Sequence, residues 1–181
     1  IKLFGYLPTV LHGDPAVFDR WFWLRQNLKS GSLRTLDAGC GSGAFAIYAA
    51  KRGNEVIGIS FDERNNRTAE ERAKILKIRN VHFITRDLRD LDKLAGELGF
   101  FDQIICLETI EHIVDDRKLL RDFSALLKPG GRVLITAPYF YYDKHLLGDD
   151  RIVLSVYNEN GLIVAGEQGG HVRWGYTHDD L

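Results

Sequence analysis

The chain has 181 residues, of which 45% are apolar and 27% are charged, and its formal net charge is −1. This composition fits one globular domain with a full hydrophobic core. The near-zero charge excludes a general electrostatic attraction for nucleic acid or anionic membranes, and no run of about 18 apolar residues is present to span a bilayer. We therefore expect a single cytoplasmic domain with no nucleic-acid or membrane partner. Its oligomeric state stays open.

The first predicted element is a helix at residues 15–28, within an N-terminal helical segment at 1–32. Asp14-Pro15 is a typical helix start, because aspartate caps the first turn and proline fits its first position. Val17, Trp21 and Leu24 recur at helical spacing and predict one buried face.

From residue 33 to residue 138, short apolar strands alternate with helical segments. Strands are predicted at 33–38, 55–60, 81–85, 101–107 and 132–137, and helices at 42–52, 62–77 and 115–127. This alternation predicts an α/β fold with a doubly wound, mainly parallel sheet. The run Lys128-Pro129-Gly130-Gly131 is predicted to end a helix and turn into the last strand. A ligand crevice is expected at the carboxyl ends of the strands, where the winding reverses.

After Pro138 the regular alternation ends. Tyr139-Phe140-Tyr141-Tyr142 opens an aromatic stretch, and residues 152–157 and 162–165 are expected to pair as a hairpin. A long insertion beside a ligand crevice is commonly a lid or binding loop. We therefore expect residues 139–176 to form such an inserted loop or hairpin.

The predicted turn after the first strand carries the pattern Asp37-x-Gly39-x-Gly41-x-Gly43. Glycine allows positive φ and close approach of a ligand to the backbone, and the following helix start presents unpaired N–H groups. Gly39 to Ala44 also fits the dinucleotide-binding pattern, so an NAD-dependent dehydrogenase is an alternative. A carboxylate from Asp37 at the mouth of the turn would repel phosphate and attract an ammonium group, which favours a different ligand.

Three later stretches add to this pattern. They are residues 101–108, Thr109-Ile110-Glu111-His112-Ile113 and residues 127–135. Together with the glycine turn they resemble, in order, the motifs of class I S-adenosylmethionine-dependent methyltransferases of the small-molecule acceptor type. The resemblance covers residues 33–138 as the cofactor-binding core. It implies a Rossmann-like methyltransferase fold, S-adenosylmethionine as cofactor and a small-molecule acceptor.

The resemblance also assigns cofactor-binding residues. The glycines Gly39, Gly41 and Gly43 would contact the methionine part, and Asp37 would lie near its amino group. Asp87, which follows the third strand and precedes Leu88, matches the position that accepts from the adenine amino group. Leu107 ends the matching fourth strand.

The second strand departs from the family pattern. It ends at Ser60, where the family usually has an acid for the ribose hydroxyls. A hydroxyl residue in that place resembles cyclopropane-fatty-acid-synthase-like members, and Phe61 is expected to pack on the adenine. Ser60 and Glu63 also fit a helix capping box, a role compatible with ribose contact.

Methyl transfer from a sulfonium is an in-line displacement for which positioning alone contributes roughly 7 to 11 kcal/mol. No metal site is predicted. A hydroxyl acceptor would benefit from a general base. Candidates are Glu108, His112, His145 and His171, of which His112 and His171 are the predicted catalytic residues; the alternative for His112 is to order its loop with Glu111. Arg173 and Tyr176 are expected near the acceptor, or in packing of their turn.

The predicted function is methyl transfer from S-adenosylmethionine to a small molecule. A cofactor-binding module without turnover and the dehydrogenase stay open as alternatives. The chain lacks Met, and Thr177-His178-Asp179-Asp180 resembles a helix start, so we expect a truncated C-terminus and a missing initiator segment. Because the family normally completes its sheet later in the chain, five parallel strands are expected, with an incomplete edge unless residues 152–165 fill it.

Overall fold

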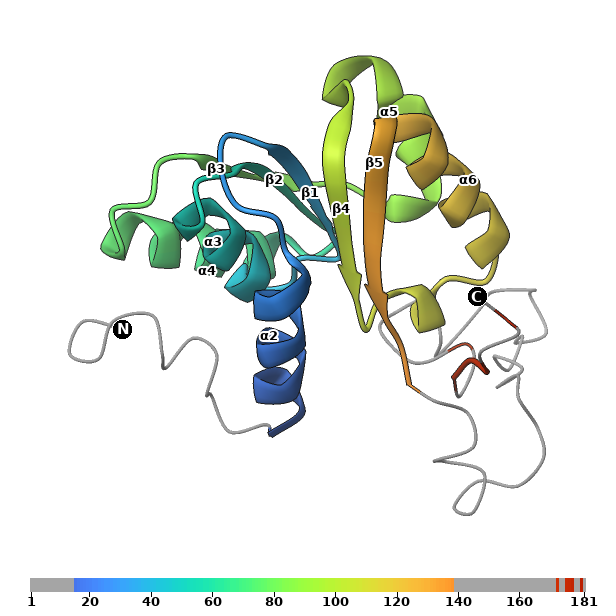
Figure 1. Ribbon diagram of the computed structural model, residues 1–181, viewed down its shortest axis with the longest axis horizontal. Coiled ribbons are helices and arrows are strands. Elements are labelled where there is room, and N and C mark those ends of the chain that lie inside the picture. Colours follow the sequence, from blue (N-terminus) through green and yellow to red (C-terminus); the bar gives the residue numbers. More distant parts are fainter. Residues whose placement is uncertain (1–14, 139–171, 173–174, 178–179, 181) are drawn as a thin grey trace.

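The computed structural model describes residues 15–138, 172, 175–177 and 180, in which helices alternate with strands (Figure 1). The helices are α2 (Pro15–Asn27), α3 (Ala44–Lys51), α4 (Glu63–Ile75), α5 (Leu91–Leu98) and α6 (Asp116–Leu126). The strands are β1 (Arg34–Ala38), β2 (Glu55–Ser60), β3 (Val81–Thr85), β4 (Phe101–Leu107) and β5 (Leu127–Thr136). Two short 3₁₀ turns, η1 (Leu88–Asp90) and η2 (Ile110–His112), follow β3 and β4.

The described strands form one five-stranded sheet in the order β3-β2-β1-β4-β5, and every neighbouring pair is parallel. From β1 the chain winds outward to β3 and then returns to place β4 on the other side of β1. This confirms the predicted doubly wound α/β sheet. The reversal lies between β1 and β4, so a ligand crevice is expected at their carboxyl ends.

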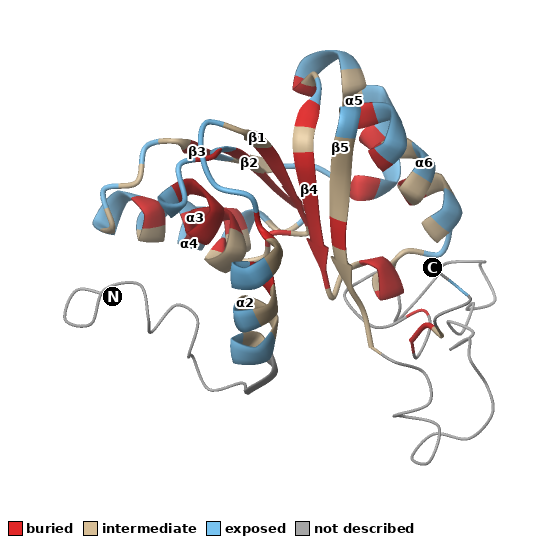
Figure 2. Ribbon diagram, viewed as in Figure 1, coloured by how far each residue is buried: buried red, intermediate tan, exposed pale blue. Residues whose placement is uncertain are grey.

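Strand side chains alternate between two hydrophobic layers. Ile105 and Leu107 pack in the layer that contains α2 and α3, whereas Ile104 and Cys106 pack in the layer that contains α5 and α6. Figure 1 shows α3 and α4 on one side of the sheet and α5 and α6 on the other. Burial on both faces explains why the central strands β1 and β4 are mostly buried along their length (Figure 2).

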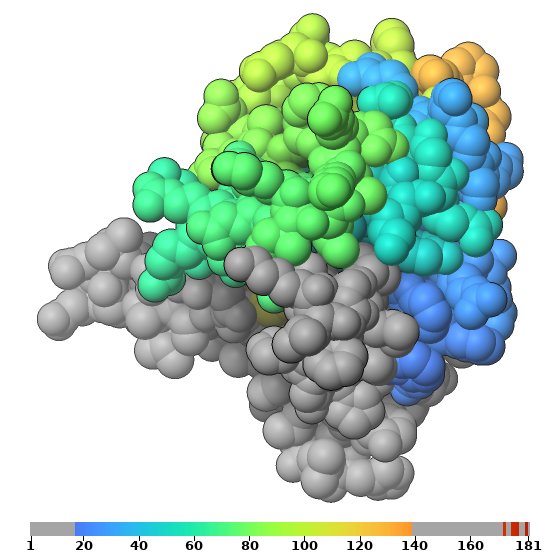
Figure 3. Space-filling view, turned by 90° about the vertical axis from the view of Figure 1, so that its left-hand side faces the viewer, coloured from blue at the N-terminus to red at the C-terminus, as the bar shows by residue number. Residues whose placement is uncertain are grey.

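Helix α2 packs beside α3. Leu24 is fully buried, and the rings of Trp21 and Tyr48 meet edge to face at 5.9 Å. The space-filling view shows the blue surface of α2 adjoining the teal surface of α3 (Figure 3). None of the described helices is long and apolar enough to cross a bilayer.

A buried polar network connects the segment after α2 to the sheet. The Gln103 amide donates to the backbone oxygen of Lys29 at 3.0 Å and to Asn54 Oδ1 at 2.7 Å. Thr35 Oγ1 donates to the same Asn54 oxygen at 2.7 Å. Buried polar groups need such partners, so the network fixes the position of the segment after α2 against the sheet.

Two predictions of local structure need correction. The run 128–131 does not precede the last strand as a separate turn, because β5 already begins at Leu127 and contains it. Phe101 pairs with Leu127, and Gln103 pairs with Arg132. Between these two pairs β5 has more residues than β4, and the extra residues of β5 form a bulge. The ion pair of Lys128 Nζ with Asp102 Oδ2, at 2.7 Å, holds the bulge against β4.

The second correction concerns α5, which was not predicted. Its apolar residues Leu91, Leu94, Ala95 and Leu98 have helical spacing, so the signal was present in the sequence. The aromatic stretch and the hairpin predicted within 139–176 lie outside the described residues, as do His145, His171 and Arg173.

Candidate cofactor and active site

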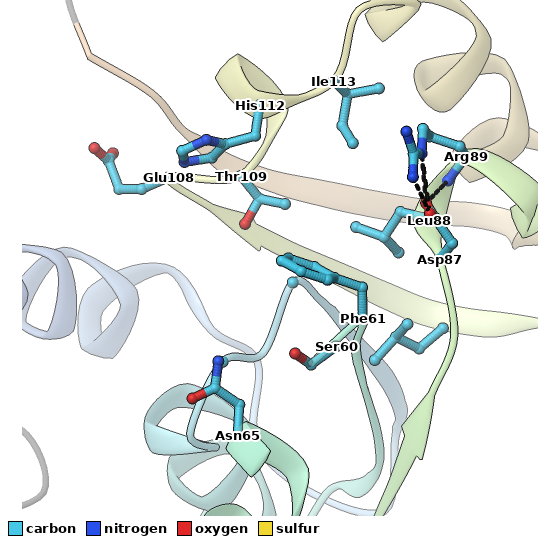
Figure 4. A pocket seen from close by; sticks show the side chains of 13 residues that line it. Ser60, Phe61, Asn65, Asp87, Leu88, Arg89, Glu108, Thr109, His112 and Ile113 are labelled. Atoms are coloured by element: carbon cyan, nitrogen blue, oxygen red, sulfur yellow. Dashed lines mark hydrogen bonds and ion pairs between the residues drawn. The ribbon is translucent and has the colours of Figure 1, made fainter. Parts of the chain in front are cut away.

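A cavity of about 300 Å³ opens at the carboxyl ends of the strands (Figure 4). The turn after β1, the end of β2 with its loop, η1 after β3 and the loop after β4 all contribute to it. Its lining residues are Gly39, Gly41, Ile59, Ser60, Phe61, Asn65, Asp87, Leu88, Arg89, Glu108, Thr109, His112 and Ile113. The cavity therefore lies where the winding of the sheet reverses, as the sequence predicts.

The three motif glycines serve different purposes. Gly39 has a φ of +87°, and a Cβ there would lie 2.3 Å from Thr109 Oγ1, so it allows the loops after β1 and β4 to meet. Gly41, with a φ of +49°, lines the cavity, and a Cβ there would meet nothing within 4 Å. At Gly43 a Cβ would lie 2.6 Å from the Cβ of Ala69. Gly43 therefore packs against α4 and does not line the cavity.

Asp37 lies beneath the glycine turn and not at its mouth. Strand alternation turns it toward α3, and it is 2% exposed. Burial raises the pKa of this carboxyl to about 7, and a hydrogen bond from the backbone N–H of Ala46 lowers it. Its Oδ2 has no hydrogen-bond partner among the described residues. The carboxylate is thus directed at the first turn of α3, the end of a helix that favours negative charge.

The loop after β2 places Ser60 and Phe61 in the cavity wall. Ser60 Oγ accepts from the backbone N–H of Asp62 at 3.2 Å, and Asp62 caps α4 by accepting from the N–H of Arg64 at 2.8 Å. The predicted capping box of Ser60 and Glu63 is therefore wrong, because α4 begins at Glu63 itself. Phe61 is 62% exposed, and its ring lies in the middle of Figure 4.

At one end of the cavity Asp87 and Arg89 form an ion pair (Figure 4). Asp87 caps η1 by accepting from the backbone N–H of Arg89 at 2.9 Å, and Arg89 Nε lies 3.0 Å from both carboxylate oxygens. Hydrogen bonds from the Arg89 side chain hold the pKa of Asp87 below its ordinary value. Leu88, between them, is buried and adds an apolar surface.

Glu108 and His112 lie at the other end of the cavity (Figure 4). Glu108 has a φ of +49°, a rare conformation for a residue with a side chain. Its N–H donates to the backbone oxygen of Thr136 at 2.9 Å, and its carboxylate accepts from Arg20 Nη2 at 3.1 Å. Helix α2 therefore reaches the cavity through Arg20.

His112 stands beside a buried carboxyl. Its Nε2 is 3.9 Å from Glu111 Oε1, and Glu111 is 1% exposed. Burial raises the pKa of Glu111 to about 7. Neither Glu111 oxygen has a hydrogen-bond partner within the part of the chain that the structure describes. His112 therefore lines the cavity with a buried carboxyl of perturbed pKa beside it, an arrangement common at functional sites.

The structure gathers most of the predicted site residues, though not all. Seven of them line the cavity: Gly39, Gly41, Ser60, Phe61, Asp87, Leu88 and His112. Leu107 is buried in the core, like Asp37 and Gly43, and does not line it. Tyr176 is buried too, and its hydroxyl lies 3.2 Å from the Ile110 backbone oxygen, so it packs its turn. His171 lies outside the described residues.

Sequence reasoning missed Ile59, Asn65, Arg89, Thr109 and Ile113 as lining residues, and Arg20 as the partner of Glu108. Each of these lining residues lies near or after the carboxyl end of a strand that was already assigned to the crevice, so this position was the available signal. No described group of three or more His, Cys, Asp or Glu side chains is arranged to hold a metal. The apolar surfaces of Phe61 and Leu88 fit a flat organic group.

Comparisons with known proteins identify relatives. Over 115 residues the chain is 31% identical to a ubiquinone biosynthesis O-methyltransferase of Leptothrix cholodnii, across 63% of this chain and 48% of that protein. The chain thus spans about half the length of the curated relatives it matches. Among solved structures it resembles the YcgJ protein of Bacillus subtilis, with a TM-score of 0.61 and 25% identity, across 67% of this chain and 51% of that one.

It also resembles the N-terminal domain of EvdMO1, solved with SAH bound, with a TM-score of 0.57 and 26% identity, across 71% of this chain and 51% of that one. Residues 29–166 match the model of a family described as a methyltransferase domain. This match includes the whole sheet and every strand-end loop that lines the cavity. The chain therefore belongs to the methyltransferase domain family.

Proposed function

We propose that the protein transfers a methyl group from S-adenosylmethionine to a small-molecule acceptor. The cavity at the carboxyl ends of the strands carries this proposal. At one end it has the apolar surface of Leu88 and the carboxylate of Asp87, which accepts hydrogen bonds. At the other end it has Glu108 and His112, which can accept a proton. The names of the relatives support it: one is an O-methyltransferase, and the EvdMO1 domain was solved with SAH, the product of such a transfer.

In the proposed complex the adenine ring packs against Phe61 and Leu88. Its amino group donates to the carboxylate of Asp87. Flat aromatic and apolar surfaces with a few polar groups are typical of small-molecule sites, and these three residues lie together along the cavity. In this proposal the purine would lie at the Asp87 end, and the rest of the ligand would extend toward Glu108.

The ribose would lie against Ser60 and Asn65. Ser60 Oγ already accepts from Asp62, but a serine hydroxyl that accepts one hydrogen bond still has a proton to donate. The Asn65 amide offers both donor and acceptor atoms in the same wall. Together these two side chains replace the single acid that the family usually has at the end of its second strand.

The methionine end would lie over the backbone of Gly39 and Gly41, where a side chain at Gly41 would occupy ligand space. Asp37 would act on the ammonium group from beneath the turn, through its charge and not by direct contact. A carboxylate at the start of α3 opposes a pyrophosphate in the same place. The comparisons likewise favour neither the dehydrogenase nor the cofactor-binding module without turnover.

The proposed reaction is a direct displacement. The acceptor oxygen attacks the methyl carbon, the electrons of the carbon–sulfur bond pass to sulfur, and the acceptor proton moves to His112. Glu111 would orient His112 and stabilise its protonated form. The remaining residues align the two reactants and exclude water, which supplies most of the rate enhancement.

Methyl transfer tests this proposal. The chain is incubated with methyl-labelled S-adenosylmethionine and a panel of phenols and other small hydroxyl compounds, with amines for comparison. We expect label in at least one hydroxyl acceptor, and a loss of about 10²-fold or more in the His112→Ala variant. Binding of SAH without transfer to any compound in the panel would instead favour the module without turnover.

A further inference from the structure

We propose that Asn66 is a positioning residue for the cofactor, which holds in place the two side chains that meet the ribose and does not touch the ligand itself. The inference rests on the proposed function, because it concerns the ribose side of the same cavity. We call Ser60 and Asn65 the ribose wall; both line the cavity and lie on the same side of it (Figure 4). Asn66 follows Asn65 in α4 but does not line the cavity.

The side chain of Asn66 makes its hydrogen bonds outside its own helix. The residue is 3% exposed, and a buried amide needs such partners. Its nitrogen donates to Thr85 Oγ1 at 2.9 Å and to the backbone oxygen of Ser60 at 3.4 Å. Its oxygen accepts from Cys40 Sγ at 3.7 Å. One buried side chain therefore connects α4 to the segments after β1, at the end of β2 and at the end of β3.

Each partner of Asn66 belongs to a segment that borders the cavity. Cys40 lies within the glycine turn, and Ser60 is part of the ribose wall. Thr85 ends β3, two residues before Asp87, and it is the register partner of Ser60. Asn66 thus sets how far these three segments lie from one another at the place where the ligand is proposed to bind.

The ribose wall depends most on this arrangement, because Asn66 couples its two members. It is the chain neighbour of Asn65, and it holds the backbone of Ser60 through the hydrogen bond to the carbonyl oxygen. The two ribose hydroxyls would need both side chains at the correct separation, since hydrogen bonds weaken steeply when their geometry is poor. The loss of the Asn66 amide should therefore weaken binding of ligands that carry these hydroxyls.

Calorimetry with two ligands tests the inference. One is SAH, and the other is its 2′,3′-dideoxy analogue, which lacks both ribose hydroxyls. We expect Asn66→Ala to bind SAH roughly three- to ten-fold more weakly than the unsubstituted chain, a factor that corresponds to about one hydrogen bond. The affinity for the analogue should be nearly unchanged. In turnover, the KM for S-adenosylmethionine should rise while kcat is kept.

Asn80→Ala is the matched control. The Asn80 amide donates to the backbone oxygens of Ala50 at 2.8 Å and Asn54 at 2.7 Å, so it also connects separate segments. It does so at the amino ends of β2 and β3, and it does not line the cavity. We expect this substitution to lower the unfolding temperature and to leave both affinities unchanged.

Thr85→Val is the second variant, for the case that Asn66→Ala does not fold. It removes the hydroxyl that accepts the shorter hydrogen bond from Asn66, and it keeps the branched shape of an exposed side chain. Asn66 then loses its best-formed partner. We expect the same difference between the two ligands, with a smaller loss for SAH.

Unchanged SAH binding in the folded variant would overturn the inference, as would an equal loss for both ligands. An equal loss of SAH affinity in Asn80→Ala would overturn it too. If the unsubstituted chain binds SAH and the analogue equally well, the ribose wall contributes nothing and the inference fails, while the proposed function stands. If the unsubstituted chain binds neither ligand, the proposed function itself is refuted.

Discussion

Arg20 Nη2 lies 3.1 Å from Glu108 Oε2, and this ion pair joins helix α2 to the loop after β4, 88 residues further along the chain. Both side chains are about three-quarters buried. Glu108 lines the cavity in a left-handed backbone conformation, which the surrounding structure must hold in place. Helix α2 thus helps to fix one wall of the site.

Arg20→Ala should therefore affect the site more than the fold. A pair of this kind contributes about 1 kcal/mol or less to stability, so a small loss in thermal unfolding is expected. The freed Glu108 should raise the KM for the acceptor several-fold. Arg25→Ala, on the same helix but stacked on Trp21, is the control and should leave KM unchanged. Equal effects of the two substitutions on KM would contradict a role of Arg20 in the site.

Substitution of two motif glycines should separate ligand binding from folding. Gly43→Ala places a methyl group 2.6 Å from Ala69, so we expect a stability loss of about 1–3 kcal/mol beyond the cost of its left-handed backbone. Gly41→Ala meets only open space and costs about 1–2 kcal/mol for its backbone conformation. It should nevertheless bind SAH much more weakly. Urea unfolding and calorimetry give the two quantities; weaker binding in Gly43→Ala alone would contradict the assignment.

The buried carboxyl of Asp37 predicts a pH dependence of stability. Its pKa is 3.8 in a model compound and about 7 in the fold, so the folded chain binds more protons between these values. Stability should therefore fall as the pH rises from about 4 to 7, and level off above. Asp37→Asn lacks this contribution.

Glu111 shifts in the same direction and is present in both proteins, so some decline remains in the Asp37→Asn variant. The measurement compares free energies of unfolding at about pH 5 and pH 8. We expect a smaller decrease in Asp37→Asn than in the unsubstituted chain. An identical decrease in both would show that Asp37 is ionised throughout this range.

The pair of Glu111 and His112 predicts the pH profile of the reaction. The pKa of Glu111 is about 7, so its negative charge beside His112 develops as the pH rises through neutrality. The rate of methyl transfer should rise over the same range. Glu111→Gln preserves the size of the side chain, and it should lower kcat and remove this inflection. A profile unchanged by Glu111→Gln would exclude its role as a positioning residue.

Much of the fold followed from the sequence because its strands are short, apolar and separated by clear helix starts. The ends of β2, β3 and β4 were predicted to the residue, which located Ser60, Asp87 and Leu107 at the edge of the sheet. Parallel strands bring their carboxyl ends together, so the cavity followed from topology alone.

Features that depend on contacts between distant parts of the chain could not be predicted from the sequence. Nothing local indicates that Lys128 pairs with Asp102 to hold a bulge inside β5, or that Arg20 reaches Glu108. Asp37 was expected at the mouth of the turn because spacing fixes its position in the chain, whereas strand alternation directs its side chain beneath α3. Likewise, Gly43 shares a motif with Gly41 but packs against Ala69.

Calorimetric titration with SAH and with NAD tests the central claim most directly. The cavity pairs apolar surfaces and the Asp87 acceptor with a glycine turn that has a carboxylate beneath it. We predict saturable binding of SAH, none of NAD, and a large loss of SAH affinity in Gly41→Ala. Binding of NAD without binding of SAH would contradict the assignment of this cavity to S-adenosylmethionine.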